Sequence, residues 1–328
     1  MYVLYGSNQS LFTRKLEAAL IFHGAPFEFR LKRGRPDVQE IERRAGTHQV
    51  PVLLTPEGWM LADTTPIIDL LDQRFPDRRL FPEGPLGVLA QIVEEYLDEW
   101  VARTMVHYRW HYPASAEFAS RAIAGGDEAA AEFIRGWGPR ACRATGTETP
   151  FHQAAAEAEY DRLLAAANAQ LAQTRYLLGD RPSVVDCMML GGFRAHTLHD
   201  PDPRKVVERF PRLVAWAERE ADAWDGTGSW ETFPQSTAFA RNVLAEAAAH
   251  YAPFLAANAR ALEAGAKAFT VETHGEPASY LTRDYPERSR GFIRERISRR
   301  LLGRERLEVD HWLQGQGLAE AFAPQSKT

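Results

Sequence analysis

The most constraining stretch of the chain is the segment of residues 47–72, THQVPVLLTPEGWMLADTTPIIDLLD. Pro51 lies directly before the short apolar run Val52–Leu54. A proline has no N–H to donate to a neighbouring strand, so within a sheet it suits only the first residue of a strand or an edge strand. We therefore expect the backbone of Val50 to be left free to pair with a group outside the sheet.

The second half of this segment predicts a helix whose beginning can hold an anion. A turn and a short second strand at 59–62 lead into the sequence DTTP at 63–66. Thr65 fits the N-cap and Pro66 the first helical position, where a missing N–H costs nothing. Apolar residues at helical spacing then continue to Phe75. The unpaired N–H groups and positive end of the helix dipole should point out of the sheet edge, where a carboxylate or phosphate would bind.

This arrangement resembles the glutathione site of the cytosolic glutathione S-transferase superfamily. In that family a thioredoxin-like domain carries Val-Pro before its third strand, and an acidic residue plus serine or threonine begins its third helix. The matching residues here are Val50–Pro51, Asp63 and Thr64. The resemblance implies that the Val50–Pro51 bond is cis and that the Val50 backbone pairs with the cysteinyl part of glutathione. An ordinary strand, turn and well-capped helix is the alternative interpretation.

The same resemblance implies which other residues bind glutathione. Asp63 and Thr64 would hold the amine and the carboxylate of the γ-glutamyl group, and Gln49 or His48 would hold the glycyl end. Glutathione would then be a cosubstrate. The chain contains no GxGxxG or P-loop pattern, so no nucleotide cofactor is expected.

The order of predicted elements around this segment is thioredoxin-like. We expect a strand at Tyr2–Tyr5, a helix that ends at Gly24, a strand at Phe27–Leu31 and an exposed helix at Pro36–Ala45. The two strands and the helix described above complete the unit. We place this α/β glutathione-binding domain at residues 1–76.

The chain after this domain is almost entirely helical. Residues 77–85, rich in proline, form the predicted linker, and residues 86–225 form a predicted all-α domain of the transferase type. A long helix is expected at 88–110. Residues 137–150 are rich in glycine and threonine and are predicted to form a loop.

A capping-box pattern extends the resemblance into this helical domain. Ser183 and Asp186 lie three residues apart at the start of an apolar helix. The pair resembles the buried helix-start signature of the family's second domain, and the FPRLVAW sequence at 210–216 carries the resemblance to about Asp225. Residues 226–328 are predicted as a mainly helical C-terminal extension of unknown role.

The extension contains a predicted helix at 286–302 that is rich in arginine. Eight arginines fall between residues 288 and 306, while Ile293, Ile297 and Leu301 line one side of the helix. Two interpretations follow. The arginines could form a surface for an anionic partner or a membrane, or the helix docks its apolar stripe and pairs its arginines with surface acids. We favour the second interpretation.

Length and composition limit the class of protein. The chain has 328 residues, a 45% hydrophobic content and a net charge of −5, which suits a globular protein of about two domains and gives no reason to expect nucleic acid as a partner. Cys142 and Cys187 are far apart and outside any CxxC motif, which favours a reducing compartment. We predict neither a signal peptide nor a membrane span, and expect a cytoplasmic location.

Activation of the glutathione thiol requires a donor near the sulfur, since the thiolate is the nucleophile. Ser10 can cap the first helix, with Arg14 one turn away as a supporting cation. It also falls where serine-type family members carry their catalytic serine, although Leu11 replaces the proline often found next. Tyr5 and Ser7 are rivals, and a plain N-cap without a catalytic role is the alternative for Ser10. The absence of cysteine at position 10 argues against thiol–disulfide reductase activity.

The remaining residue patterns add little chemistry. His107 and His111 are one helical turn apart, but no third ligand at a suitable distance suggests a metal site.

From the resemblance and the candidate residues above, we predict a glutathione transferase that attacks a small, hydrophobic electrophile bound between the domains, with detoxification as the expected role. The resemblance implies a homodimer. The alternative hypothesis is a non-catalytic glutathione-binding or scaffold protein of the same fold.

Overall fold

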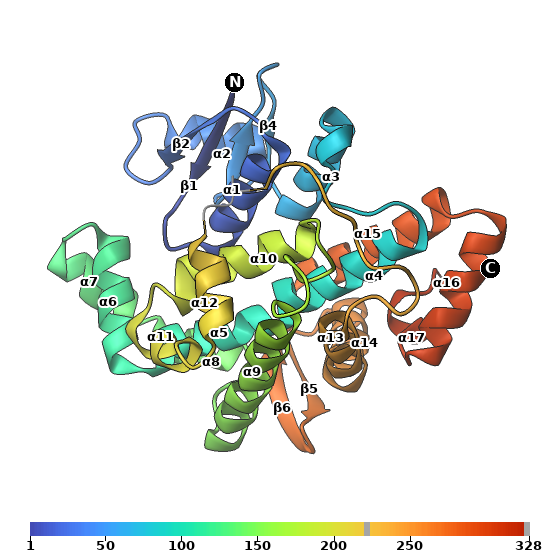
Figure 1. The fold of residues 1–328 in the computed structure, drawn as a ribbon. Helices are drawn as coiled ribbons and strands as arrows, with labels where there is room; N and C mark the ends of the chain where they lie inside the picture. The colour runs from blue at the N-terminus through green and yellow to red at the C-terminus, as the bar shows by residue number, and fades with distance from the viewer. Residues whose placement is uncertain (220–223, 325–328) are drawn as a thin grey trace.

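The computed structural model describes residues 1–219 and 224–324, and its N-terminal part is a four-stranded mixed sheet with helices (Figure 1). The strand order is β2-β1-β3-β4, in which β1 and β2 are parallel and the other pairs are antiparallel. The predicted thioredoxin-like pattern followed by helices is confirmed. The elements of this first part are β1 (Tyr2–Gly6), α1 (Leu11–His23), β2 (Phe27–Leu31), α2 (Val38–Ala45), β3 (Val52–Leu54), β4 (Met60–Leu61) and α3 (Thr64–Arg74).

The start of α3 differs from the sequence prediction. The helix begins at Thr64, so Asp63 takes the N-cap position and Pro66 is the third helical residue. The proline is still tolerated, because the first N–H groups of a helix have no partner within it. The hydroxyl of Thr65 donates to Glu94 Oε1 at 3.1 Å instead of capping the helix. A contact with a residue far along the chain has therefore replaced the predicted local cap.

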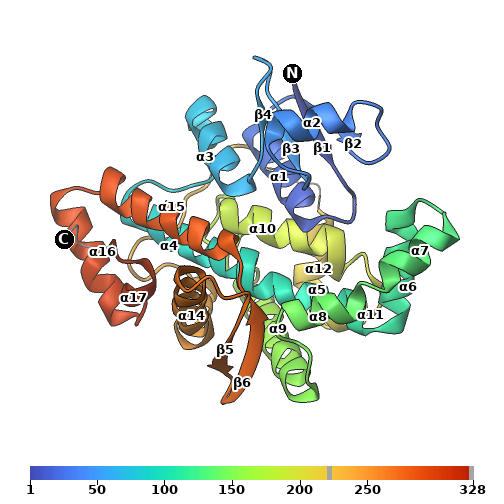
Figure 2. The same ribbon diagram turned by 180° about the vertical axis from the view of Figure 1, so that it is seen from behind.

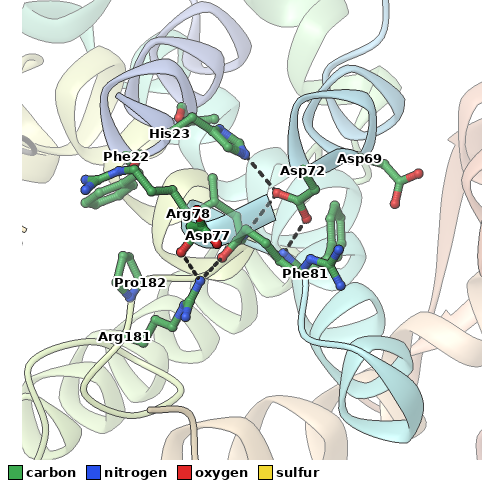
Figure 3. Close-up of polar contacts among 12 residues, drawn as sticks. Phe22, His23, Asp69, Asp72, Asp77, Arg78, Phe81, Arg181 and Pro182 are labelled. Carbon is green, nitrogen blue, oxygen red and sulfur yellow. Dashed lines mark hydrogen bonds and ion pairs between the residues drawn. The ribbon is translucent and has the colours of Figure 1, made fainter. Parts of the chain in front are cut away.

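The connection between α3 and α4 is held by polar contacts (Figure 3). Asp72, near the end of α3, accepts hydrogen bonds of 2.8 Å from the backbone N–H groups of residues 80 and 81. The Nε2 atom of His23 lies 2.8 Å from the same carboxylate. Arg181, from the helical part, donates to the carbonyl of Asp77 at 3.0 Å. This connection is therefore tied to both parts that it joins.

The middle of the chain is helical, as predicted, with one correction. The predicted loop at 137–150 is wrong in part, because residues 138–144 form a short helix that packs against α5. Gly138 allows this approach: an added Cβ would lie 3.0 Å from the carbonyl oxygen of Trp110. The elements are α4 (Gly84–Glu95), a π-helical turn (Tyr96–Val101), α5 (Ala102–His111), α6 (Pro113–Ala124), α7 (Glu128–Arg135), α8 (Gly138–Ala144), α9 (Pro150–Gln170), α10 (Val184–Gly192), a second π-helical turn (Phe193–Thr197), α11 (Pro201–Val207) and α12 (Pro211–Glu218).

The predicted capping box at the start of α10 is present. Asp186 Oδ2 accepts from the backbone N–H and the hydroxyl of Ser183, both at 2.8 Å. Asp186 Oδ1 accepts from the N–H of Leu177 at 2.9 Å. Helix α10 then packs closely on α1, because Gly191 has no side chain: a Cβ there would lie 2.6 Å from the Leu11 carbonyl oxygen. This contact joins the sheet-containing part to the helical part.

The C-terminal extension packs along α4 and near α3 (Figure 2). Ile293 and Ile297 of its arginine-rich helix are fully buried, and Leu301 is 2% exposed. Arg296 and Arg300 both pair with Asp69 of α3. The docking interpretation of this helix is therefore confirmed. The extension contains α13 (Ala238–Glu246), a π-helical turn (Ala247–Tyr251), α14 (Ala252–Glu263), β5 (Ala268–Thr273), β6 (Glu276–Leu281), α15 (Asp284–Arg300), α16 (Gly303–Gly315) and α17 (Ala319–Phe322).

Two further observations concern the described residues as a whole. Within 1–219 and 224–324, no helix is long and apolar enough to cross a membrane. Residues 220–223 of the predicted helical domain and 325–328 of the predicted extension lie outside the described part. The largest hydrophobic core is shared by the sheet-containing part, the helical part and the extension.

Candidate functional site

A hollow of about 330 Å³ lies where the first domain, the α4–α5 region and the extension meet. The first domain contributes five of the residues predicted to bind glutathione: Gln49, Val50, Pro51, Asp63 and Thr64. The apolar part of the lining includes Leu11, Phe12, Ala102 and Val106. His48, the alternative to Gln49, does not line the hollow.

The Val50–Pro51 segment forms one side of the hollow, and its peptide bond is cis, as the resemblance implies. No hydrogen bond to the N–H or the carbonyl of Val50 is made by any residue of the described ranges. The segment is held from behind by Lys32, whose Nζ donates to the carbonyls of His48 at 2.7 Å and Gln49 at 2.8 Å. The backbone of Val50 is therefore available to a ligand.

Lys32 was not found by sequence reasoning. Its side chain is 4% exposed and it forms an ion pair with Glu42 at 3.1 Å. In the sequence it is simply the end of a strand followed by Arg33 and Gly34. Only the folded chain shows that it reaches the segment before Pro51, so no local signal could have identified it.

The N-terminus of α3 faces the same hollow. Asp63 has φ 76° and its side chain makes no capping hydrogen bond to the helix. A non-glycine residue in a sparsely populated region of this kind costs roughly 1–3 kcal/mol and is most often found at functional sites. Because Ala62, Asp63 and Thr64 line the hollow, the positive end of the α3 dipole opens into it.

Buried acids from the π-helical turn form the inner wall. Asp98 and Glu99 line the hollow and are 8% and 9% exposed. Burial raises the pKa of Asp98 well above its usual range, against the opposing charge of Lys15. Burial also raises the pKa of Glu99, while Arg283 opposes the shift. Sequence reasoning missed these acids. A signal was present in the run EEYLDEW at 94–100, where the acids at 98 and 99 follow those at 94 and 95 by one helical turn and therefore share a face of the helix with them.

Lys15 ties this acidic wall to the first domain. Its ammonium is fully buried and contacts Glu94 Oε1, Asp98 Oδ1 at 3.3 Å and the hydroxyl of Thr65 at 3.0 Å. These contacts connect α1, α3 and the π-helical turn. The position of Asp98 in the hollow therefore depends on a lysine of the opposite domain.

Ser10 is the N-cap of α1, as predicted. Its Oγ accepts a hydrogen bond from the N–H of Thr13 at 3.3 Å. Ser10 itself does not line the hollow, whereas the next two residues, Leu11 and Phe12, do. Arg14 is engaged by Glu17 at 2.7 Å and also donates to Asn8. The helix N-terminus thus adjoins the hollow, and the capping hydroxyl lies beside it.

The rival hydroxyls lie elsewhere. Tyr5 is 4% exposed and packs with Ile41 and Val52 in a small separate core, with the Arg35 guanidinium 5.2 Å from its ring centre. The Ser7 hydroxyl donates to Gln9 Oε1 at 3.0 Å. Neither Tyr5 nor Ser7 is among the residues that line the hollow.

The two histidines on α5 are stacked, with ring centres 4.8 Å apart, and His107 Nε2 lies 2.8 Å from Glu157. The described ranges contain no group of three or more histidine, cysteine or acidic side chains that could hold a metal ion.

Cys142 and Cys187 are free and buried, and burial raises the pKa of both thiols. Neither cysteine lines the hollow.

Two domain families match the chain in the expected order. Residues 4–79 match the glutathione S-transferase N-terminal domain, and residues 150–219 match the glutathione S-transferase C-terminal domain. The chain belongs to the glutathione S-transferase superfamily. Both matches end before the extension that begins after residue 225.

Several solved structures are similar to part of this chain. A β-etherase, LigF, from Sphingobium sp. strain SYK-6 is 20% identical, with 69% of this chain and 96% of that chain covered and a TM-score of 0.48. A glutathione S-transferase from Methylobacterium radiotolerans, crystallised with glutathione sulfonate, is 21% identical, with coverage of 72% and 99% and a TM-score of 0.43. Gtt2 from Saccharomyces cerevisiae is 17% identical, with coverage of 67% and 98% and a TM-score of 0.43.

Proposed function

We propose that this protein is a glutathione transferase that activates the glutathione thiol for attack on a small, hydrophobic electrophile. One observation carries the proposal: the unpaired backbone of Val50 and the uncapped N-terminus of α3 face the same hollow. The free N–H and carbonyl of one residue can pair with the backbone of a short peptide, and the adjacent helix N-terminus can bind a carboxylate of that peptide.

The tripeptide would lie along these groups in an extended conformation. Its cysteinyl part pairs with the N–H and carbonyl of Val50, in the manner of a strand added to a sheet edge. The γ-glutamyl carboxylate sits at the N–H groups that begin α3, at Thr64, and the ammonium lies by Asp63. The glycyl carboxylate is within the range of Gln49. This arrangement leaves the cysteinyl sulfur near the beginning of α1.

Ser10 is our candidate for activating the sulfur. A cysteine-like thiol has a pKa of about 8.5, and a reduction of about two units stabilises the thiolate by roughly 2.7 kcal/mol. The Ser10 Oγ accepts from Thr13, so its hydrogen remains available to donate to sulfur. Because Leu11 and Phe12 adjoin the hollow, the positive end of the α1 dipole would add to this stabilisation.

The reaction itself is a nucleophilic displacement or addition at carbon. The thiolate sulfur forms a bond to an electrophilic carbon, and in a displacement the leaving group departs with the bonding electrons. The apolar lining from Leu11, Phe12, Ala102 and Val106 would accommodate the electrophile. The side chains named here bind, orient and stabilise charge.

A second candidate function is non-catalytic glutathione binding by a scaffold protein of the same fold. The observation that favours it is the position of Ser10, whose side chain caps α1 and does not line the hollow. If no other donor reaches the sulfur, glutathione would bind without activation.

A conjugation assay with a chloronitrobenzene separates the two functions. We expect turnover by the wild type, and a loss of up to about a hundredfold in kcat for Ser10→Ala with little change in glutathione affinity. Ser7→Ala is the matched control and should retain activity. Because loss of the cap costs about 1 kcal/mol, the fold of Ser10→Ala is checked by thermal unfolding. Binding without turnover, unchanged in Ser10→Ala, would establish the scaffold function instead.

A further inference from the structure

A short segment of the extension, residues 283–289, forms one wall of the hollow. Arg283, Tyr285 and Ser289 line it, although both family matches end by residue 219. Three side chains of this segment bind residues of the hollow. Arg283 pairs with Glu99 at 3.0 Å, the Tyr285 hydroxyl donates to Gln49 Oε1 at 2.6 Å, and Arg288 pairs with Asp63 at 3.3 Å.

The segment is held in place from both ends. The fully buried Asn258 donates to the carbonyl of Arg283 at 2.9 Å and accepts from its N–H at 3.0 Å. Further along, Arg296 pairs with Asp69 at 2.8 Å while Ile293 is buried in the core. These anchors fix the beginning of α15, from which Tyr285 and Ser289 line the hollow.

Without this segment, the lining of the hollow contains more acidic than basic side chains. Its acids are Asp63, Asp98 and Glu99, and its other cation, Arg103, is engaged by Glu159 outside the lining. Glutathione carries two carboxylates and one ammonium at neutral pH, so it is a net anion. Arg283 in the lining and Arg288 beside it pair with two of these acids, and so reduce the negative charge that such a ligand would meet.

We propose that residues 283–289 complete the glutathione site of this protein and recognise the carboxylates of the tripeptide, an inference that rests on the proposed function. Arg288 shares the γ-glutamyl end with Asp63, pairing with the carboxylate while Asp63 pairs with the ammonium. Arg283 neutralises the acidic wall at Glu99. Tyr285 is a positioning residue: its hydroxyl occupies the amide oxygen of Gln49 and so directs the amide NH₂ group toward the glycyl carboxylate.

Calorimetric titration of the full-length protein with reduced glutathione tests this proposal. We expect the Kd to rise by about tenfold in Arg283→Gln and by about three- to tenfold in the half-exposed Arg288→Gln. The control is Arg299→Gln on the same helix, whose side chain is 77% exposed and pairs with Glu295. The Kd of this control should stay within about twofold of the wild-type value.

Tyr285→Phe gives a sharper test, because it removes one hydroxyl and keeps the ring. The Kd for glutathione should rise by about three- to tenfold. The Kd for γ-glutamylcysteine, which lacks the glycyl carboxylate, should stay unchanged. Equal thermal unfolding of each variant and the wild type shows that the fold is kept.

The outcomes separate the two proposals. If the wild type binds glutathione and the folded Arg283, Tyr285 and Arg288 variants bind it equally well, the role of the segment is refuted and the proposed function stands. If Tyr285→Phe weakens both peptides equally, its role at the glycyl end is refuted. If the wild type binds no glutathione, the proposed function fails, and the role of the segment fails with it.

Discussion

Replacement of Lys15 by methionine should strongly destabilise the protein, because it removes the only cation that touches both Glu94 and Asp98 among the described residues. The ammonium and the Glu94 side chain are fully buried, and the Asp98 side chain is 10% exposed. Burial by itself would lower the pKa of Lys15, but Asp98 and Glu94 outweigh it and raise the pKa above its ordinary value. The lysine is therefore charged at neutral pH, and its ammonium lies between the two acidic side chains.

The expected loss follows from the charges left behind. Removing one partner of a buried ion pair typically costs about 3–5 kcal/mol, because the remaining charge is uncompensated. With a urea dependence of about 3 kcal/mol per molar, the unfolding midpoint should fall by about 1–1.7 M at neutral pH. Methionine has a similar volume, so a cavity contributes little to this difference.

Urea unfolding followed by tryptophan fluorescence measures the effect. The matched variant is Lys15→Met combined with Glu94→Met, which removes the fully buried carboxylate together with its cation. We expect this pair to recover at least half of the loss, since an apolar pair of similar volume often replaces a buried ion pair without cost. The reasoning is refuted if Lys15→Met costs less than about 1 kcal/mol, or if the double variant is as unstable as the sum of both single variants.

Two further predictions concern other buried contacts. Burial would raise the pKa of Glu159, but Arg103, His274 and Tyr96 outweigh it and lower the pKa from 4.5 to about 2, which corresponds to about 3 kcal/mol of stability. This stability is present above pH 4.5 and is lost as the pH falls toward 2. In urea titrations, the difference in unfolding free energy between the wild type and Glu159→Gln should therefore shrink between pH 4.5 and pH 2. A difference that stays constant over this range would contradict the lowered pKa of Glu159. Gly191→Ala would place a Cβ 2.7 Å from the Lys15 backbone nitrogen and should cost about 1–3 kcal/mol in thermal unfolding. The control Gly315→Ala, whose Cβ meets nothing within 4 Å, should be neutral or stabilising, and equal behaviour of the two variants would refute this account of the packing.

The elements of the first domain could be predicted because their signals are local. The strand Phe27–Leu31 has the predicted bounds, and α1 ends at Gly24 in a left-handed conformation that glycine adopts easily. The Ser183–Asp186 capping box is also a contact within one helical turn. The five predicted residues that line the hollow lie within one segment of the chain, so their order alone brings them together.

The rest of the site depends on contacts between distant parts of the chain. Lys15 reaches Asp98 across 83 positions, and Tyr285 reaches Gln49 across 236. No periodicity or spacing encodes such a meeting, because it follows from how whole helices pack. The same reason explains the error at Thr65, whose hydroxyl was expected to cap α3 and instead bonds to a carboxylate on α4.

The most direct test of the glutathione site is a crystal structure of the protein with glutathione bound. We predict that the cysteinyl backbone pairs with the N–H and carbonyl of Val50, and that the γ-glutamyl carboxylate lies at the N-terminus of α3 beside Thr64. The sulfur should then lie close to the Ser10 hydroxyl. Glutathione bound elsewhere, or a Val50 backbone that remains unpaired in the complex, would contradict the account.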